Sequence, residues 1–98
     1  MDTEVIIKAL ANPVRREILK WLKTPTQYFP EQYHSLEIGV CAGQIDQLTG
    51  LSQSTVSNHL SVLQKAGLIN CHKMGQWSFY SRNETIIQQF LTALHEDL

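Results

Sequence analysis

The sequence lacks the features of secreted and membrane proteins. Its 98 residues include only two cysteines, Cys41 and Cys71, which are too few for a disulfide scaffold and form no C-x-x-C pair. No stretch approaches the roughly 20 apolar residues that a membrane span needs. The N-terminus, Met-Asp-Thr-Glu, has no basic lead of the kind found in signal peptides. We therefore expect a cytoplasmic protein with reduced thiols and no membrane partner.

Acidic residues are missing from a long central window. Neither Asp nor Glu occurs between Gln47 and Asn83, whereas three basic residues and two histidines lie there, although the net charge of the chain is −1. A surface that faces phosphates excludes carboxylates, because they would repel the nucleic-acid backbone. The pattern favours a nucleic-acid contact within this window, with chance clustering in a short chain as the alternative.

Catalytic signatures are missing as well. No Ser/His/Asp arrangement, phosphate-binding loop or paired metal motif can be assembled from this sequence. A chain of this length forms one domain with a limited core, so pairing of two copies would bury useful apolar surface. We predict a non-enzymatic binding protein that forms a dimer.

Apolar periodicity predicts a mainly α fold with a small β-hairpin over residues 1–98. The expected helices span 4–11, 13–23, 43–49, 52–66 and 84–96, and the expected strands span 68–72 and 77–81. Asn12 as N-cap and Pro13 as first helical residue separate the first two helices, and residues 73–76 form the hairpin turn. Residues 24–40 are expected to form a long loop. Its aromatic segment, Tyr28-Phe29-Pro30 with Tyr33, either covers the core or lines a pocket.

Two of these helices are joined by a very short turn. Gly50 suits the left-handed conformation that ends the first helix, and Ser52 is expected to cap the second. A helix-turn-helix over about 43–66, followed directly by a wing over about 68–82, is a winged helix-turn-helix. The expected order is ααααββα.

The second helix of this pair has an unusual polar face. At 100° per residue, Val56, Leu60 and Leu63 share the packed side, and the opposite side shows small hydroxyls and amides. Such side chains suit the major groove, because amides pair with base edges and serine lets the helix approach closely. A merely solvated face would contain more Lys and Glu, which favour helices. His59, at the edge of the packed side, is expected to be partly buried and bonded to the backbone.

Three segments resemble ArsR-type repressors. Residues 9–19, ALANPVRREIL, are similar to the opening of these proteins, and residues 51–68 are similar to their recognition helix. Gly75-Gln76, followed by Phe79-Tyr80-Ser81, is similar to their wing. The resemblance covers most of the chain except residues 24–40. It implies a homodimeric repressor that leaves a double-stranded DNA operator when an inducer binds.

The polar face and the resemblance together assign the residues of two sites. The predicted DNA-binding residues are Ser52, Gln53, Ser54, Ser57, Asn58, Ser61, Lys73, Gln76 and Arg82. The resemblance also implies pairing of the dimerisation helices at about 4–11 and 84–96. The implied dimer residues are Val5, Ile6, Leu10, Ile87, Phe90, Leu91 and Leu94.

The family's metal sites are incomplete in this chain, so we expect no metal and no cofactor. The family motif E-x-C-V-C reads Glu37-Ile38-Gly39-Val40-Cys41 here, and Ile86 stands where the last helix of relatives has a ligand. Two sensing alternatives stay open. His34, Glu37 and Cys41 would share a face if residues 35–42 were helical. Cys41 and Cys71 would form a redox switch if their Cα atoms lay within about 7 Å.

The leading hypothesis is a sequence-specific DNA-binding repressor with an unidentified inducer. A second class is a winged-helix protein–protein interaction module without specific DNA binding, since a fold does not fix a function. That alternative predicts an exposed apolar patch where the first hypothesis predicts the polar helix face.

Overall fold

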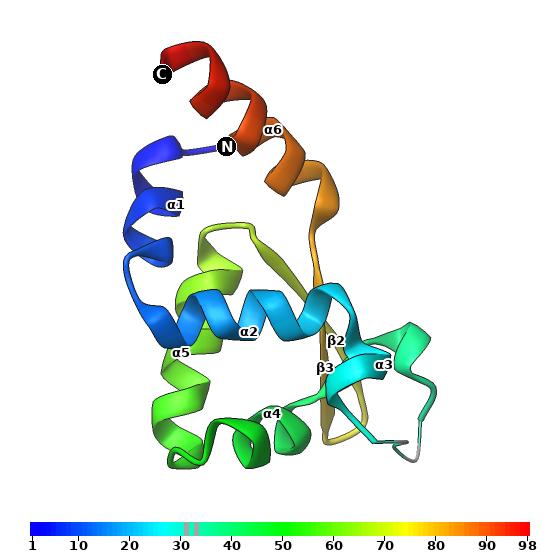
Figure 1. The fold of residues 1–98 in the computed structure, drawn as a ribbon. Helices are drawn as coiled ribbons and strands as arrows, with labels where there is room; N and C mark the ends of the chain where they lie inside the picture. The colour runs from blue at the N-terminus through cyan, green and yellow to red at the C-terminus, as the bar shows by residue number, and fades with distance from the viewer. Residues whose placement is uncertain (31, 33) are drawn as a thin grey trace.

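The computed structural model describes residues 1–30, 32 and 34–98 (Figure 1). The elements are α1 (Thr3–Leu10), α2 (Pro13–Lys23), α3 (Pro25–Tyr28), the 3-10 turn η1 (Leu36–Ile38), β1 (Val40–Cys41), α4 (Ala42–Thr49), α5 (Gln53–Lys65), β2 (Ile69–Met74), β3 (Trp77–Arg82) and α6 (Glu84–Asp97). This order confirms a mainly helical winged helix-turn-helix with a small antiparallel sheet. None of the helices in the described part of the chain is long and apolar enough to span a bilayer.

Short-range signals set the helix boundaries. The Asn12 side chain accepts hydrogen bonds from the backbone N–H groups of Val14 at 2.8 Å and Arg15 at 3.3 Å, so it caps α2 as predicted. The Asn83 side chain caps α6 in the same way through the N–H of Ile86. Each cap satisfies N–H groups that have no partner inside their own helix.

The turn between α4 and α5 confirms the helix-turn-helix. Gly50 ends α4 with φ 69° and ψ 9°, a left-handed conformation that favours glycine. Its N–H bonds the carbonyl oxygen of Asp46. Ser52 Oγ then accepts a hydrogen bond from the N–H of Thr55 and caps α5. The chain therefore passes from α4 to α5 within three residues, Gly50 to Ser52, which keeps the two helices close together.

The sheet has three strands rather than the predicted two. Its order is β1-β3-β2, and Val40 and Cys41 of β1 pair with Tyr80 and Phe79 of β3. The expected loop at residues 24–40 is therefore wrong in part, because it also contains α3 and η1. The expected turn at 73–76 shrinks to Gly75-Gln76, since β2 extends to Met74, which pairs with Trp77. A two-residue turn with glycine at positive φ fits the twist of a hairpin.

A side chain supports the short strand β1. Gln32 Nε2 donates to the carbonyl oxygen of Gly39 at 2.7 Å, and Gln32 Oε1 accepts from the N–H of Cys41 at 3.0 Å. One carboxamide thus pairs with two backbone groups that a neighbouring strand would otherwise engage. This pairing explains how a strand of only two residues persists.

The main core lies between the helices and one face of the sheet. Its fully buried members include Ile6 of α1, Ile18 of α2, Val40 of β1 and Leu63 of α5. On the opposite face of the sheet, Phe79 is buried beneath the His34 ring, with 5.0 Å between ring centroids.

The aromatic segment of residues 28–30 mainly covers the core. Phe29 is buried and packs edge-on against Trp21, and Tyr28 is partly buried against the same core. The covering interpretation is therefore confirmed for these two residues, whereas Pro30 is exposed. Tyr33 lies outside the described residues.

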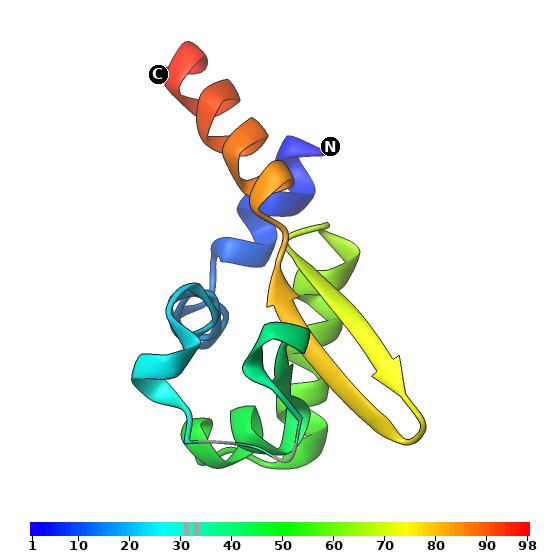
Figure 2. The same ribbon diagram turned by 90° about the vertical axis from the view of Figure 1, so that its right-hand side faces the viewer.

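The elements divide between two ends of the molecule. α1 and α6 lie at one end, and the turn between β2 and β3 lies at the other end with α4 and the start of α5 (Figures 1 and 2). The two regions that the sequence assigns to dimerisation and to DNA are therefore separated in space, with α5 running between them.

Candidate nucleic-acid interface

The outward face of α5 is polar and open to solvent. Gln53, Ser54, Ser57 and Asn58 are exposed, whereas Ser61 is partly buried. On the inward side, Val56, Leu60 and Leu63 are buried, as the helical periodicity predicted. A helix fixed by three buried aliphatic residues therefore presents amides and hydroxyls along its first two turns. These groups can donate to and accept from base edges.

The start of α5 can also face a phosphate. Its first turn consists of uncharged residues, and the N-terminal N–H groups of a helix form a partially positive site. Ser52, however, uses its hydroxyl within the protein, because Oγ donates to Thr55 Oγ1 at 2.8 Å and accepts from the Thr55 N–H. Its side chain therefore caps the helix, as predicted, and Ser52 stays exposed at the start of α5.

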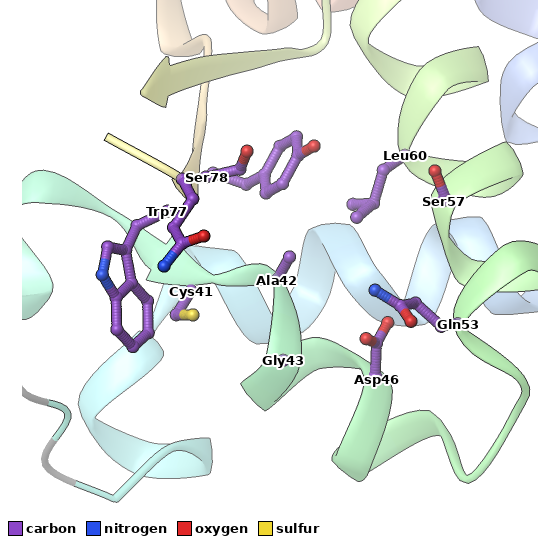
Figure 3. Close-up of a pocket in the computed structure, with 11 residues that line it drawn as sticks. Cys41, Ala42, Gly43, Asp46, Gln53, Ser57, Leu60, Trp77 and Ser78 are labelled. Carbon is purple, nitrogen blue, oxygen red and sulfur yellow. The ribbon is translucent and has the colours of Figure 1, made fainter. Parts of the chain in front are cut away.

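A groove separates α5 from the wing (Figure 3). It encloses about 390 Å³, with Gln53 and Ser57 of α5 on one side and Ser78 and Trp77 of β3 on the other. Asp46 of α4 also lines it, and burial raises the pKa of this carboxyl group above its ordinary value. The charge pattern did not indicate Asp46, because this residue lies directly before the acid-free window that begins at Gln47. The packing of α4 against α5 places its carboxyl group in the groove.

The wing residues differ in what they can reach. Lys73 and Gln76 are exposed near the tip of the hairpin, where a charged group and an amide can meet a nucleic-acid backbone. Arg82 is different, because only 15% of its side chain is exposed. Its guanidinium pairs with Glu84 and donates to the carbonyl oxygen of Leu19 at 3.2 Å. The prediction of Arg82 as a DNA contact is therefore wrong: it ties β3 to α2 and α6.

His59 lies where α5 meets α2. It is partly buried as predicted, but its Nδ1 atom lies 3.2 Å from Arg15 NH1, so the expected backbone partner is wrong. Burial lowers the pKa of His59, and the positive charge of Arg15 lowers it further. His59 is therefore held neutral, and it supplies no positive charge to a phosphate.

Known proteins share this architecture. The model of the family described as bacterial regulatory protein, arsR family, matches residues 40–70, which include β1, α4 and α5. The HTH-type transcriptional regulator YbzH of Bacillus subtilis is 36% identical over the full length of both chains. This chain belongs to the ArsR family.

Two further relatives agree with that assignment. The transcriptional repressor SdpR of Bacillus subtilis is 32% identical over 85% of this chain and 78% of its own. The solved structure of HlyU from Vibrio cholerae, a protein named a transcriptional activator, has 32% identity. It aligns with a TM-score of 0.66 over 94% of this chain and 86% of its own. The protein is therefore a DNA-binding transcriptional regulator of the helix-turn-helix type and not an enzyme.

The residues that the ArsR resemblance assigned to a dimer interface fall into two groups, those buried within the protomer and those that keep exposed apolar surface. Ile6, Ile87 and Phe90 are buried within the protomer, so they join α1 and α6 to its core and cannot be surface contacts. This corrects the prediction for these three residues. The remaining candidates keep exposed or half-buried apolar surface, and Ile7, which the sequence analysis missed, joins them at 41% exposure. The candidates are Val5, Ile7, Leu10, Leu91 and Leu94.

The hypothesis of a local metal site is wrong. Residues 35–42 do not form one helix: η1 ends at Ile38, Gly39 has φ 129°, and the chain then enters β1. His34, Glu37 and Cys41 consequently share no helical face. In the part of the chain that the structure describes, no three His, Cys, Asp or Glu side chains are grouped as a metal site.

The hypothesis of a redox switch formed by Cys41 and Cys71 of one chain is also wrong. Cys41 pairs with Phe79 and Cys71 with Tyr80, which are adjacent residues of β3. Since successive residues of a strand point to opposite faces, the two thiols lie on opposite faces of the sheet. With β3 between them, their strands are about 9.5 Å apart, which exceeds the roughly 7 Å Cα limit for a disulfide.

Proposed function

We propose that this regulator is a homodimer that binds a near-palindromic operator through two copies of α5 and represses transcription until an inducer releases it. The observation that supports the proposal is the face of α5, where exposed amides and hydroxyls cover the side opposite the buried stripe. The proposed base-reading residues are Gln53, Ser54, Ser57, Asn58 and Ser61, with Lys73 and Gln76 on the backbone. Repression follows the example of SdpR, and activation, as named for HlyU, is the opposite outcome.

The pairing of two copies rests on the end of the molecule that holds α1 and α6. Val5, Ile7 and Leu91 are between 41% and 49% exposed there, and this apolar surface is favourable to bury against a second copy. A two-fold dimer presents two recognition helices to successive major grooves about 34 Å apart.

DNA reading is tested by fluorescence anisotropy with the upstream region of the protein's own gene. We expect the double substitution Gln53→Ala with Ser57→Ala to weaken binding at least about tenfold, because each lost base contact costs about 1–3 kcal/mol. The matched control is Gln88→Ala with Thr85→Ala, which removes an exposed amide and hydroxyl from α6. Equal affinities for the two double variants, or wild-type binding no tighter than to random duplex, would contradict the proposal.

The dimer is tested by sedimentation. We expect Leu91→Glu to shift the protein toward monomers and to weaken operator binding, because a buried, unpaired carboxylate opposes association. Gln89→Glu, at an exposed polar position of α6, introduces the same charge as a control. An unchanged mass for Leu91→Glu would remove α6 from the interface. A reporter gene behind the same upstream region gives the sign of regulation: deletion of the regulator raises expression if it represses.

A further inference from the structure

One side chain connects three helices. Arg15 Nε donates to the carbonyl oxygen of Ala9 at 2.6 Å, and Arg15 NH2 donates to the carbonyl oxygen of Lys8 at 3.2 Å. The third nitrogen, NH1, lies 3.2 Å from Nδ1 of His59 on α5. A single guanidinium in the first turn of α2 therefore contacts both the end of α1 and the side of α5.

The direction of these contacts follows from helix geometry. Arg15 lies near the start of α2, where side chains lean back toward the helix N-terminus and hence toward the preceding helix. The carbonyl groups of Lys8 and Ala9 belong to the last turn of α1, where carbonyl oxygens have no N–H partner four residues further along the helix. The Lys8 oxygen also accepts the N–H of the C-cap residue Ala11 at 3.2 Å. A cation at this position also interacts favourably with the negative end of the α1 dipole.

The contact with α5 has one consistent hydrogen-bonding pattern. A guanidinium only donates, so Nδ1 of His59 must accept and the ring must be neutral, with its proton on Nε2. The lowered pKa of His59 agrees with this assignment. If the ring became protonated, Nδ1 would lose its lone pair and two positive charges would face each other across 3.2 Å.

We propose that Arg15 is a positioning residue for DNA binding, which sets the place of the recognition helix α5 relative to α1. This inference rests on the proposed function, in which α1 takes part in the dimer and α5 reads the operator. If α1 belongs to the dimer interface and α5 binds the operator, the contacts of Arg15 with α1 and α5 set the distance between the two α5 helices of the dimer. Any displacement of α5 against α1 occurs in both copies and therefore alters the match to half-sites about 34 Å apart.

The chain offers a closely matched control for this role. Arg16 NH1 donates to the carbonyl oxygen of Leu10 at 2.6 Å, so it also joins α2 to the end of α1, but the contact to α5 is made by its neighbour Arg15. Lysine keeps the charge but has one nitrogen, so it cannot reach at once the three acceptors that Nε, NH1 and NH2 of Arg15 reach separately. Both variants therefore disturb a contact between α2 and α1, but Arg15→Lys also disturbs the contact with α5.

The experiment compares a duplex that contains both half-sites, as defined by footprinting with the wild-type protein, with a duplex that contains one. We expect Arg15→Lys to lower the affinity for the double site about tenfold, equivalent to about 1.4 kcal/mol, and to change the affinity for the single site less than about twofold. Arg16→Lys should behave as the wild type. All proteins are compared well below their melting temperatures, with the folded fraction measured by circular dichroism.

Substitutions on the other side of the contact test the same link independently of the stability of Arg15→Lys. His59→Asn keeps an acceptor near the place of Nδ1 and should bind as the wild type, whereas His59→Leu removes the acceptor and should resemble Arg15→Lys. The slope of affinity against salt should be unchanged in Arg15→Lys; a slope reduced by about one charge would instead indicate a lost phosphate contact.

A pH series adds a second readout. Lowering the pH through the pKa of His59 should weaken double-site binding of the wild type more than that of His59→Asn. The elements packed against α5 carry other charged or titratable groups, which are present in both proteins. They are Glu4 and Lys8 of α1, Arg15, Arg16, Glu17, Lys20 and Lys23 of α2, Asp46 of α4, and Cys71, His72 and Lys73 of β2. The difference between the two profiles therefore isolates His59.

The results separate this inference from the proposed function. If the wild type binds neither duplex more tightly than random DNA, the proposed function fails. If the wild type binds and Arg15→Lys and His59→Leu keep the full preference for the double site, Arg15 has no positioning role, whereas the proposed function stands.

Discussion

Replacing Gly39 with alanine is expected to disrupt the junction between η1 and β1. Gly39 has φ 129° and ψ 179°, a backbone conformation that is nearly restricted to glycine. A Cβ atom there would lie 2.9 Å from the carbonyl oxygen of Tyr80 and 3.1 Å from its carbonyl carbon and amide nitrogen. Because all three atoms belong to the backbone of β3, no side-chain rotation relieves the clash.

The expected cost has two parts. The conformation itself costs about 1–3 kcal/mol for a residue with a side chain. Moving β1 away from β3 to relieve the contact weakens the pairing of Val40 with Tyr80, and each lost hydrogen bond costs about 1 kcal/mol. The sum is about 2–4 kcal/mol of unfolding free energy, which lowers the melting temperature of a chain this size by about 10 °C or more.

Thermal unfolding followed by circular dichroism measures this effect, and a second glycine provides the control. Gly43 lies in α4, and a Cβ there would meet none of the described atoms within 4 Å. Gly43→Ala is therefore expected to stabilise the protein by about 0.4–1 kcal/mol, through a less flexible unfolded chain. Equal melting temperatures for the two variants, or a higher one for Gly39→Ala, would refute the steric argument.

Three further predictions concern stability. Asn12→Ala removes both cap hydrogen bonds of α2 and should lower the unfolding free energy by about 0.5–2 kcal/mol in urea titrations, with an unchanged midpoint speaking against the cap. The lowered pKa of His59 means that the unfolded chain binds more protons in acid, so the stability it contributes is present above about pH 6.5 and declines as the pH falls below that value. His59→Asn should flatten this decline below about pH 6.5, and parallel profiles would contradict the assignment. Gln32→Leu removes the two bonds to β1 and should cost about 1–3 kcal/mol of unfolding free energy, whereas Gln27→Leu, an exposed position of α3, should cost less than about 0.5 kcal/mol.

The parts of the fold that the sequence predicted well depend on short-range interactions. Asn12, Gly50, Ser52 and Asn83 act on backbone groups within three or four residues, so their effect is visible in the sequence. The alternation of buried and exposed residues along α5 follows in the same way from helical periodicity. These signals were sufficient for the helix-turn-helix and the hairpin.

The features that the sequence missed depend on partners far along the chain. β1 has two residues and exists because β3 on one side and the Gln32 carboxamide on the other complete its hydrogen bonds. Two residues are too few for an alternating pattern, so no window analysis could detect this strand. The predicted interface role of Ile6 is wrong because the sequence of α1 shows that Ile6 is apolar but not whether its own protomer or a second copy buries it.

By itself, the sequence determined the longer helices, the hairpin, the polar face of α5 and the family, because each rests on residue types at short, regular spacings. Only the tertiary structure decided which polar and charged side chains remain available. It directed Arg82 to Leu19 and Glu84, Arg15 to His59, and Asp46 into the groove beside Gln53. The physical reason is that a long polar side chain bonds whatever groups the packed helices place within its reach, and those groups can be 63 residues away.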